Sequence, residues 1–183
     1  MMVRTENCSF KLLKRTIMSR GFVKEDDQEE IPLVPPRADL PIWAENWVTP
    51  AGMEALQQER ADLISEQEKL DPSHEREYRI AFNHLNARLQ LLNGRMASAK
   101  IIDTARLSQG EVHFGATVTF KNLNNNLRQT FQLVGVDEAN ISKGKLAFTT
   151  PLAKALINSK VGEKVTLQLG DKTNIFEILS IGY

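Results

Sequence analysis

The hydrophobic pattern of this chain of 183 residues changes period near its middle. Between residues 49 and 103, apolar side chains recur at alternating spacings of four and three, which is typical of a helix packing one narrow stripe against a partner helix. The second half of this segment has an unbroken stripe: Tyr78, Phe82, Leu85, Leu89, Leu92, Met96 and Ala99. The first half has a matching stripe with two polar members: Met53, Leu56, Arg60, Leu63, Gln67 and Leu70. We therefore expect an antiparallel coiled-coil hairpin.

Capping residues set the expected ends of these two helices. Thr49 suits the N-cap of the first helix and Pro50 its first position, where the missing N–H of proline is harmless. Asp71 and Pro72 repeat this arrangement, so we expect Asp71 to cap the second helix and the charged tip to lie near residues 69–77. The first helix would then have roughly 20 residues and a length of about 30 Å.

After residue 103 the pattern alternates with a period of two and favours strands. Thr150 and Pro151 start a short helix that we expect to run through Asn158. A sheet of about five short strands crossed by one helix is a small α+β module. The predicted strands cover residues 112–120, 128–134, 146–148, 165–169 and 173–181.

The N-terminal 47 residues have a different composition from the rest. An acidic run at 24–30 is followed by a proline-rich run at 31–41, and neither can form a packed core. We expect a disordered or extended leader, acting either as an interaction arm or as a solvated tail, with Met18 as an alternative start. Trp43 and Trp47, the only tryptophans, are expected to pack at the base of the hairpin, with a surface anchor as the alternative. The predicted domains are therefore 1–47, 48–103 and 104–183.

Composition excludes several classes of protein. Lys plus Arg and Asp plus Glu both number 23, so the formal net charge is zero, and no apolar run of membrane-spanning length occurs. The single cysteine, Cys8, excludes a disulfide framework, and the three histidines have no ligand-like spacing. The C-terminal half contains no phosphate-binding glycine loop and no Ser-His-Asp set. We expect a cytoplasmic protein that does not bind membranes, and a monomer, because an antiparallel hairpin satisfies its own apolar stripe.

Five motifs occur in order along the chain: Val48–Leu56 at the start of the hairpin, then Val112–Val118, Val134–Ala139, Thr150–Ile157 and Lys160–Glu163. They resemble motifs of the Gre transcript-cleavage factors, which are bacterial elongation factors that bind RNA polymerase. The resemblance covers about residues 48–183 and implies a C-terminal domain with the fold of FK506-binding prolyl isomerases, an FKBP-like antiparallel sheet with one short helix.

The resemblance implies an accessory factor that is not an enzyme, has no cofactor or metal of its own, and inserts its hairpin into the secondary channel of the polymerase. Carboxylates at the tip would help to hold the second catalytic Mg²⁺ of the polymerase, because this ion prefers hard oxygen ligands. Asp71 matches the first acid of the family's tip motif, whereas His74 stands at the second, and a neutral imidazole is a poorer Mg²⁺ ligand than a carboxylate. Glu75, one position later, is the candidate substitute. Capping alone would also explain Asp71.

Two further groups of residues are candidates for contacts. The resemblance places Asp137, Glu138 and Pro151 on the surface that meets the polymerase rim, although the two acids could equally form only a turn. Arginines of the second helix are candidates for contact with nascent RNA, or for simple solvation of an outer helix face. These arginines are Arg79, Arg88 and Arg95.

The tip departs from the family in length as well as in composition. The first helix is shorter than in cleavage-active members, and a hairpin lacking two turns would stop about 11 Å short. Two functions therefore stay open: stimulation of transcript cleavage in backtracked complexes, or occupation of the channel that modulates or inhibits polymerase without cleavage. A standalone isomerase or chaperone is a further alternative, although the C-terminal half lacks the aromatic ring of an isomerase pocket. The ordered motifs argue against a generic coiled-coil adaptor.

Overall fold

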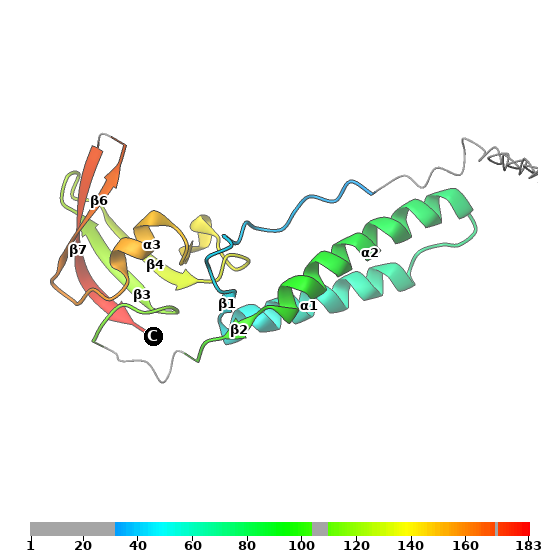
Figure 1. Cartoon of the computed structure of the whole chain (residues 1–183), viewed down its shortest axis with the longest axis horizontal. Helices are drawn as coiled ribbons and strands as arrows, with labels where there is room; N and C mark the ends of the chain where they lie inside the picture. The colour runs from blue at the N-terminus through cyan, green and yellow to red at the C-terminus, as the bar shows by residue number, and fades with distance from the viewer. Residues whose placement is uncertain (1–31, 104–109, 171) are drawn as a thin grey trace, which may run out of the picture. The chain divides into compact units, whose positions relative to one another are not determined.

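The structure is a computed structural model that describes residues 32–103, 110–170 and 172–183. Helices α1 (Pro50–Glu68) and α2 (Glu75–Ala97) lie side by side as a hairpin (Figure 1). The predicted start of α1 is confirmed: Thr49 Oγ1 accepts a hydrogen bond of 2.9 Å from the Gly52 N–H, and Pro50 occupies the first turn. Its 19 residues match the length expected from the sequence.

The facing stripes of the two helices form the core of the hairpin. Leu56 and Leu63 of α1 are buried against Leu85 and Leu92 of α2. The two polar members of the α1 stripe have polar partners on α2. Arg60 donates to Asn93 (3.0 Å) and Gln67 donates to Asn86 (2.8 Å). Gln67 lies seven residues after Arg60 on α1, and its partner Asn86 lies seven residues before Asn93 on α2. These two hydrogen bonds therefore favour a single antiparallel register of the helices.

The start of the second helix differs from the prediction, which was wrong about the N-cap. Asp71 does not cap α2, because its Oδ1 accepts from the Ser73 N–H at 2.9 Å and closes a local turn. The helix begins at Glu75, with His74 at the N-cap position and no hydrogen bond from its side chain to the helix. The chain does reverse where the sequence predicted, but it needs three more residues after Asp71 to do so.

Two short parallel strands that the sequence did not predict join the two ends of the hairpin. Strand β1 (Trp47–Val48) pairs with β2 (Lys100–Ile101). The Lys100 N–H donates to Asn46 O at 2.8 Å, and the Ile102 N–H donates to Val48 O at 3.0 Å. This pairing fixes where the chain enters α1 relative to where it leaves α2.

The second half of the chain forms a five-stranded sheet in the order β5-β4-β3-β7-β6. Strands β4 and β5 are parallel, and the other neighbours are antiparallel, so the prediction of a wholly antiparallel sheet was wrong. The connection from Gly135 to Gly144 brings the chain back along β4 to the level of Gln132, which pairs with Lys145, so the two strands run in the same direction. The strands are β3 (Thr117–Asn122), β4 (Arg128–Val134), β5 (Lys145–Ala147), β6 (Lys164–Leu169) and β7 (Lys172–Gly182).

Local backbone conformation explains where the predicted elements were misplaced. The first strand starts at Thr117 and not at residue 112, because Gly115 adopts φ 87° and interrupts the extended chain. Helix α3 (Pro151–Leu156) is capped by Thr150 as predicted, but it ends before Asn158, which has φ 66°. The 3₁₀ helix η3 (Ile141–Lys143) was not predicted. The bounds predicted for β4 are confirmed.

One face of the sheet is covered by α3, where Ala153 and Leu156 are buried against the β-strands. A separate aromatic cluster includes Trp47, whose ring stacks on Phe148 with centroids 5.1 Å apart. The side chain of Trp43 is 64% exposed, so the prediction that both tryptophans pack at the base of the hairpin was wrong for this one, and its exposure agrees with the alternative of a surface residue.

The described chain from Pro32 to Tyr183 forms one compact unit by its contacts. The domain boundaries predicted near residues 47 and 103 stay predictions. Residues 1–31, which include the acidic run and the alternative start at Met18, lie outside the described residues. None of the helices in the described part of the chain is long and apolar enough to cross a membrane.

Candidate functional site

The tip of the hairpin presents a run of polar side chains to solvent. Every residue from Asp71 to Glu77 is exposed. Hydrogen bonds from Ser73, chiefly from its backbone N–H, lower the pKa of Asp71 below its ordinary value. The Asp71 side chain is therefore a carboxylate at neutral pH.

The neighbours of Asp71 determine what the tip can coordinate. His74 Nδ1 lies 3.0 Å from Ser73 Oγ, so one ring nitrogen is engaged within the tip. Glu75 and Glu77 stand in the first turn of α2, where the helix dipole stabilises negative charge. Within residues 32–103, 110–170 and 172–183, no group of three or more His, Cys, Asp or Glu side chains is placed to hold a metal ion. The tip can thus offer carboxylate oxygens to an external ion.

At the other end of the hairpin, the start of α1 is bound by the turn Gly135–Glu138 after β4, which we call the acidic turn. Glu138 Oε1 accepts from the Thr49 N–H at 3.0 Å, and Glu138 Oε2 accepts from Thr49 Oγ1 at 2.6 Å. A carboxylate at a helix N-terminus is stabilised by free N–H groups and by the helix dipole. Gly52 makes the approach possible, because a Cβ there would lie 2.1 Å from Glu138 Cδ.

Beside this contact, four charged side chains form what we call the base cluster: Arg37, Glu59, Arg95 and Asp137. Arg37 donates to both carboxylate oxygens of Glu59 (2.9 and 3.1 Å) and to Asp137 Oδ1 (3.0 Å). Arg95 Nε lies 3.0 Å from Asp137 Oδ2, as an ion pair without hydrogen-bond geometry. The Asp137 side chain is only 6% exposed. The base cluster therefore ties the leader, α1, α2 and the acidic turn together.

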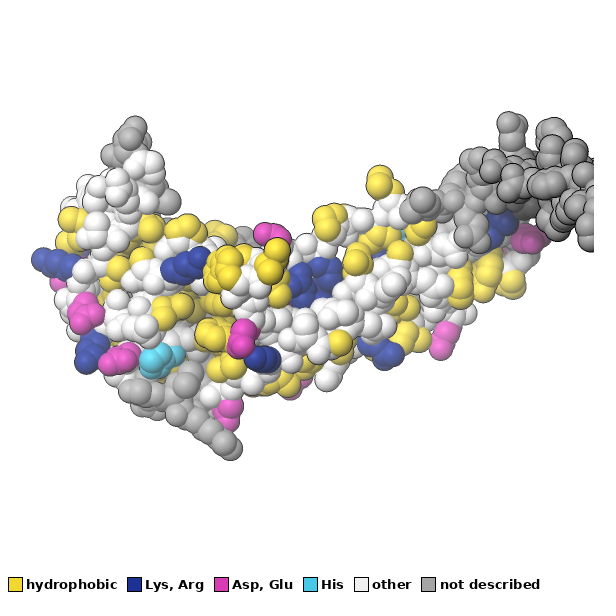
Figure 2. Space-filling view, viewed as in Figure 1, with side chains coloured by type: hydrophobic (Ala, Val, Ile, Leu, Met, Phe, Trp, Pro, Cys, Tyr) yellow, Lys and Arg dark blue, Asp and Glu magenta, His cyan; other side chains and the backbone are white. Residues whose placement is uncertain are grey.

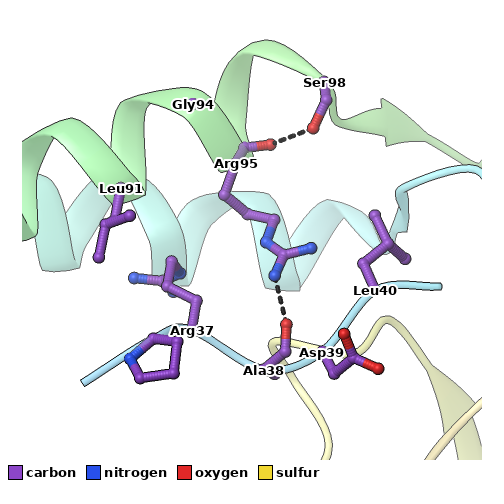
Figure 3. Close-up of a pocket in the computed structure, with 9 residues that line it drawn as sticks. Arg37, Ala38, Asp39, Leu40, Leu91, Gly94, Arg95 and Ser98 are labelled. Carbon is purple, nitrogen blue, oxygen red and sulfur yellow. Dashed lines mark hydrogen bonds between the residues drawn. The ribbon is translucent and has the colours of Figure 1, made fainter. Parts of the chain in front are cut away.

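The base cluster also holds the main chain of the leader. Arg95 reaches from α2 toward residues 37–40 and donates to the carbonyl of Ala38 (Figure 3). Residues 36–40 of the leader and the C-terminal part of α2 line a pocket of about 440 Å³ that is open to solvent. Hydrogen bonds to Glu59 are the main cause that raises the pKa of Arg37 above its ordinary value, so the guanidinium is charged at any relevant pH.

The structure separates the residues that the sequence grouped as candidate contacts. Asp137 and Glu138 are occupied by partners within the chain, whereas Pro151 is exposed at the start of α3. Arg79 is exposed and Arg88 is half-buried on α2, while Arg95 belongs to the base cluster. None of these observations tests the predicted contacts with polymerase or RNA, and those roles stay predictions.

Sequence reasoning missed Arg37 and Glu59. One signal was available for Arg37, which is the single basic residue in the proline-rich run of residues 31–41. Glu59 offered no signal, because it is one of several acids on the outer side of α1.

Comparison with known proteins identifies the family. The family model described as "Transcription elongation factor, GreA/GreB, C-term" matches residues 107–183. The chain is 34% identical over 151 residues to the transcription elongation factor GreA of Thermodesulfovibrio yellowstonii, covering 74% of this chain and 96% of that protein. The same identity and coverage hold for GreA of Trichlorobacter lovleyi. A solved structure of the Gfh1 protein of Thermus thermophilus, a GreA factor homolog, covers 76% of this chain and 100% of its own, at 22% identity and a TM-score of 0.35. The chain belongs to the GreA/GreB family of transcription elongation factors, which are accessory factors and not enzymes.

Proposed function

We propose that this protein binds RNA polymerase and inserts the tip of its hairpin into the secondary channel, helping backtracked complexes to resume by stimulating cleavage of the nascent transcript. The observation that supports this proposal is the ionised, fully exposed Asp71 at the end of α1 and α2, remote from the base cluster. A narrow two-helix hairpin with an acidic tip suits delivery of carboxylates into a confined site.

In this proposal the Mg²⁺ belongs to the polymerase, and it supplies the Lewis acidity that activates the attacking water. Asp71 contributes a carboxylate oxygen to that ion, held in place by the Ser73 N–H. Glu75 is the second candidate ligand. It stands at the first position of α2, immediately after His74.

A second function is favoured by two specific observations. His74 occupies the place of the second acid of the family's tip motif, and α1 has only 19 residues. Both features suit a regulator that occupies the channel and modulates polymerase without cleavage, because metal coordination tolerates no gap of several ångströms between ligand and ion.

The experiment that separates these functions is transcript cleavage in stalled, backtracked elongation complexes. Wild-type protein is compared with Asp71→Ala and with the matched control Glu66→Ala, which removes an exposed acid within α1. We expect short 3′ RNA fragments with the wild type and the control, and a loss of at least tenfold with Asp71→Ala. If none of the three proteins produces fragments while all bind polymerase, the chain is a non-cleaving regulator.

Several narrower statements belong to the same proposal. The hairpin is a coiled coil, the sheet module is FKBP-like, and the factor acts in the cytoplasm as a monomer. Pro151 meets the polymerase rim, and Arg79 and Arg88 contact nascent RNA. The matched register of the α1 and α2 stripes supports the coiled coil, and the exposure of Pro151 and Arg79 leaves them accessible to partners.

A further inference from the structure

Two large apolar side chains project into solvent from a turn in the leader. Ile42 is fully exposed (106% of its reference area) and Trp43 is 64% exposed. The turn is closed by a hydrogen bond of 2.8 Å from the Ala44 N–H to Pro41 O. An isolated exposed apolar residue needs no explanation, but an adjacent isoleucine and tryptophan at the apex of an ordered turn form a contiguous apolar tip.

This apolar tip is held from both sides. Leu40, Ala44 and Trp47, which flank it, pack against the aromatic cluster of Phe114 and Phe148. Trp47 stacks on Phe148 with centroids 5.1 Å apart, so the backbone on both sides of the apolar tip is anchored to this cluster. The two exposed side chains are therefore presented by a fixed scaffold, which lowers the entropy lost when a partner binds them.

The apolar tip of Ile42 and Trp43 lies beside α3. Lys154 Nζ sits 3.9 Å from the centroid of the Trp43 ring and covers one face of it, in a cation–π contact. Lys154 is itself exposed and lies one helical turn after Pro151. Figure 2 shows hydrophobic side chains gathered where the leader passes α3, with a basic side chain at their edge. The contact between Lys154 and Trp43 thus brings the apolar tip next to α3, the helix that begins at the exposed Pro151.

The contacts of nearby residues within the chain indicate which partner this surface could bind. Of the three residues predicted to meet the polymerase rim, Asp137 and Glu138 are engaged by Arg37, Arg95 and Thr49 within the chain. Pro151 is the one that remains exposed, and the apolar tip adjoins it through Lys154.

We propose that Ile42 and Trp43, together with Lys154, form a docking surface for RNA polymerase, on which they fit an apolar pocket bordered by a carboxylate. This inference rests on the function proposed above. Tryptophan is one of the three residue types enriched among those that dominate binding energy, and a fixed tryptophan beside a cation matches a pocket of that chemistry. The leader thus contributes to affinity for the polymerase, whereas the hairpin acts at the active site.

The test measures the affinity of the full chain for core RNA polymerase of the same organism, by biolayer interferometry. The variants are Trp43→Ala, Ile42→Ser and Lys154→Glu. The control is Leu127→Ser, which removes another exposed apolar side chain, 53% exposed, from the loop before β4. We expect Kd to rise about 10- to 30-fold for Trp43→Ala and to stay within about twofold for the control. Lys154→Glu should weaken binding several-fold, more strongly at low salt.

Each outcome is decisive. Since all substituted side chains are exposed, thermal unfolding should be unchanged, and this is checked for every variant. If wild type binds but Trp43→Ala binds equally well, the docking surface is wrong and the proposed function stands. If wild type does not bind polymerase at all, both fall. If the wild type is a dimer and Trp43→Ala is a monomer with unchanged Kd for polymerase, the apolar tip serves self-association and the inference is overturned.

Discussion

Replacing Arg37 by alanine tests whether the base cluster holds the leader and the hairpin to the acidic turn. The substitution removes two hydrogen bonds to Glu59 and one to Asp137. The side chain of Glu59 is 37% exposed and regains water, so the loss of that pair costs about 0.5 kcal/mol. Asp137 is almost fully buried and would keep only its contact with Arg95, which costs about 1–3 kcal/mol.

The two contributions together predict a loss of about 2 kcal/mol in the free energy of unfolding. For a unit of the size of Pro32–Tyr183, this corresponds to a fall in Tm of about 4–8 °C. The assay is thermal and urea unfolding of the full chain, followed by circular dichroism. Arg37→Lys should fall between the wild type and Arg37→Ala, because an ammonium cannot bind both oxygens of Glu59 in the planar geometry of a guanidinium.

The matched control for this prediction is Arg128→Ala, which removes an exposed arginine from the start of β4 and should change stability by less than about 0.5 kcal/mol. A double-mutant cycle of Arg37→Ala with Asp137→Ala should give a coupling energy of about 1 kcal/mol or more. If Arg37→Ala unfolds like the wild type and the cycle shows no coupling, the base cluster does not hold the leader, and the reasoning is refuted.

The remaining predictions concern the two ends of the hairpin. Gly52→Ala places a Cβ 2.1 Å from Glu138 Cδ and displaces that carboxylate from Thr49, so it should destabilise the protein by about 2 kcal/mol in urea unfolding. By contrast, Gly94→Ala in α2 meets no atom within 4 Å and should stabilise it by about 1 kcal/mol; destabilisation by both would contradict this account. At the tip, an NMR titration should find the pKa of Asp71 below its ordinary value, partly restored in Ser73→Ala, which keeps the backbone donor. Because this pKa is lowered on folding, the Asp71 carboxylate contributes to stability at neutral pH, and the contribution is lost as the pH falls through the lowered pKa. An ordinary pKa of Asp71 in the wild type would show that its carboxylate does not accept from the Ser73 N–H.

Local chemistry made part of the fold predictable from the sequence. The start of α1 at Thr49 and Pro50 was predictable because the capping hydrogen bond joins groups only three positions apart, whereas the added bonds from Glu138 to Thr49 were not. The packing of Leu85 and Leu92 was predictable because a stripe with spacings of three and four lies on one face of a helix, whatever the rest of the chain does. The same argument misled us at Asp71, where a turn to Ser73 competes for the same carboxylate as a helix cap.

The base cluster could not be predicted, because it depends on pairing across long distances in sequence. Arg37 and Asp137 are 100 residues apart, and nothing in the composition around either one identifies the other. The tryptophans show the same limit. Trp43 and Trp47 have similar neighbours in sequence, yet Trp47 enters the aromatic cluster and Trp43 remains outside. Only the path of the leader over the sheet domain distinguishes them.

The most direct test of the account is to locate the hairpin tip within the polymerase complex. Ser73→Cys in a Cys8→Ser background gives a single thiol at the tip, to which an iron chelate that generates hydroxyl radicals is attached. Leu127→Cys in the same background, in the loop before β4, is the control. We predict that the tip probe cuts the nascent RNA near its 3′ end and the polymerase next to its catalytic Mg²⁺, whereas the control probe cuts neither. Full binding to polymerase without cuts near the active site from the tip probe would contradict the account.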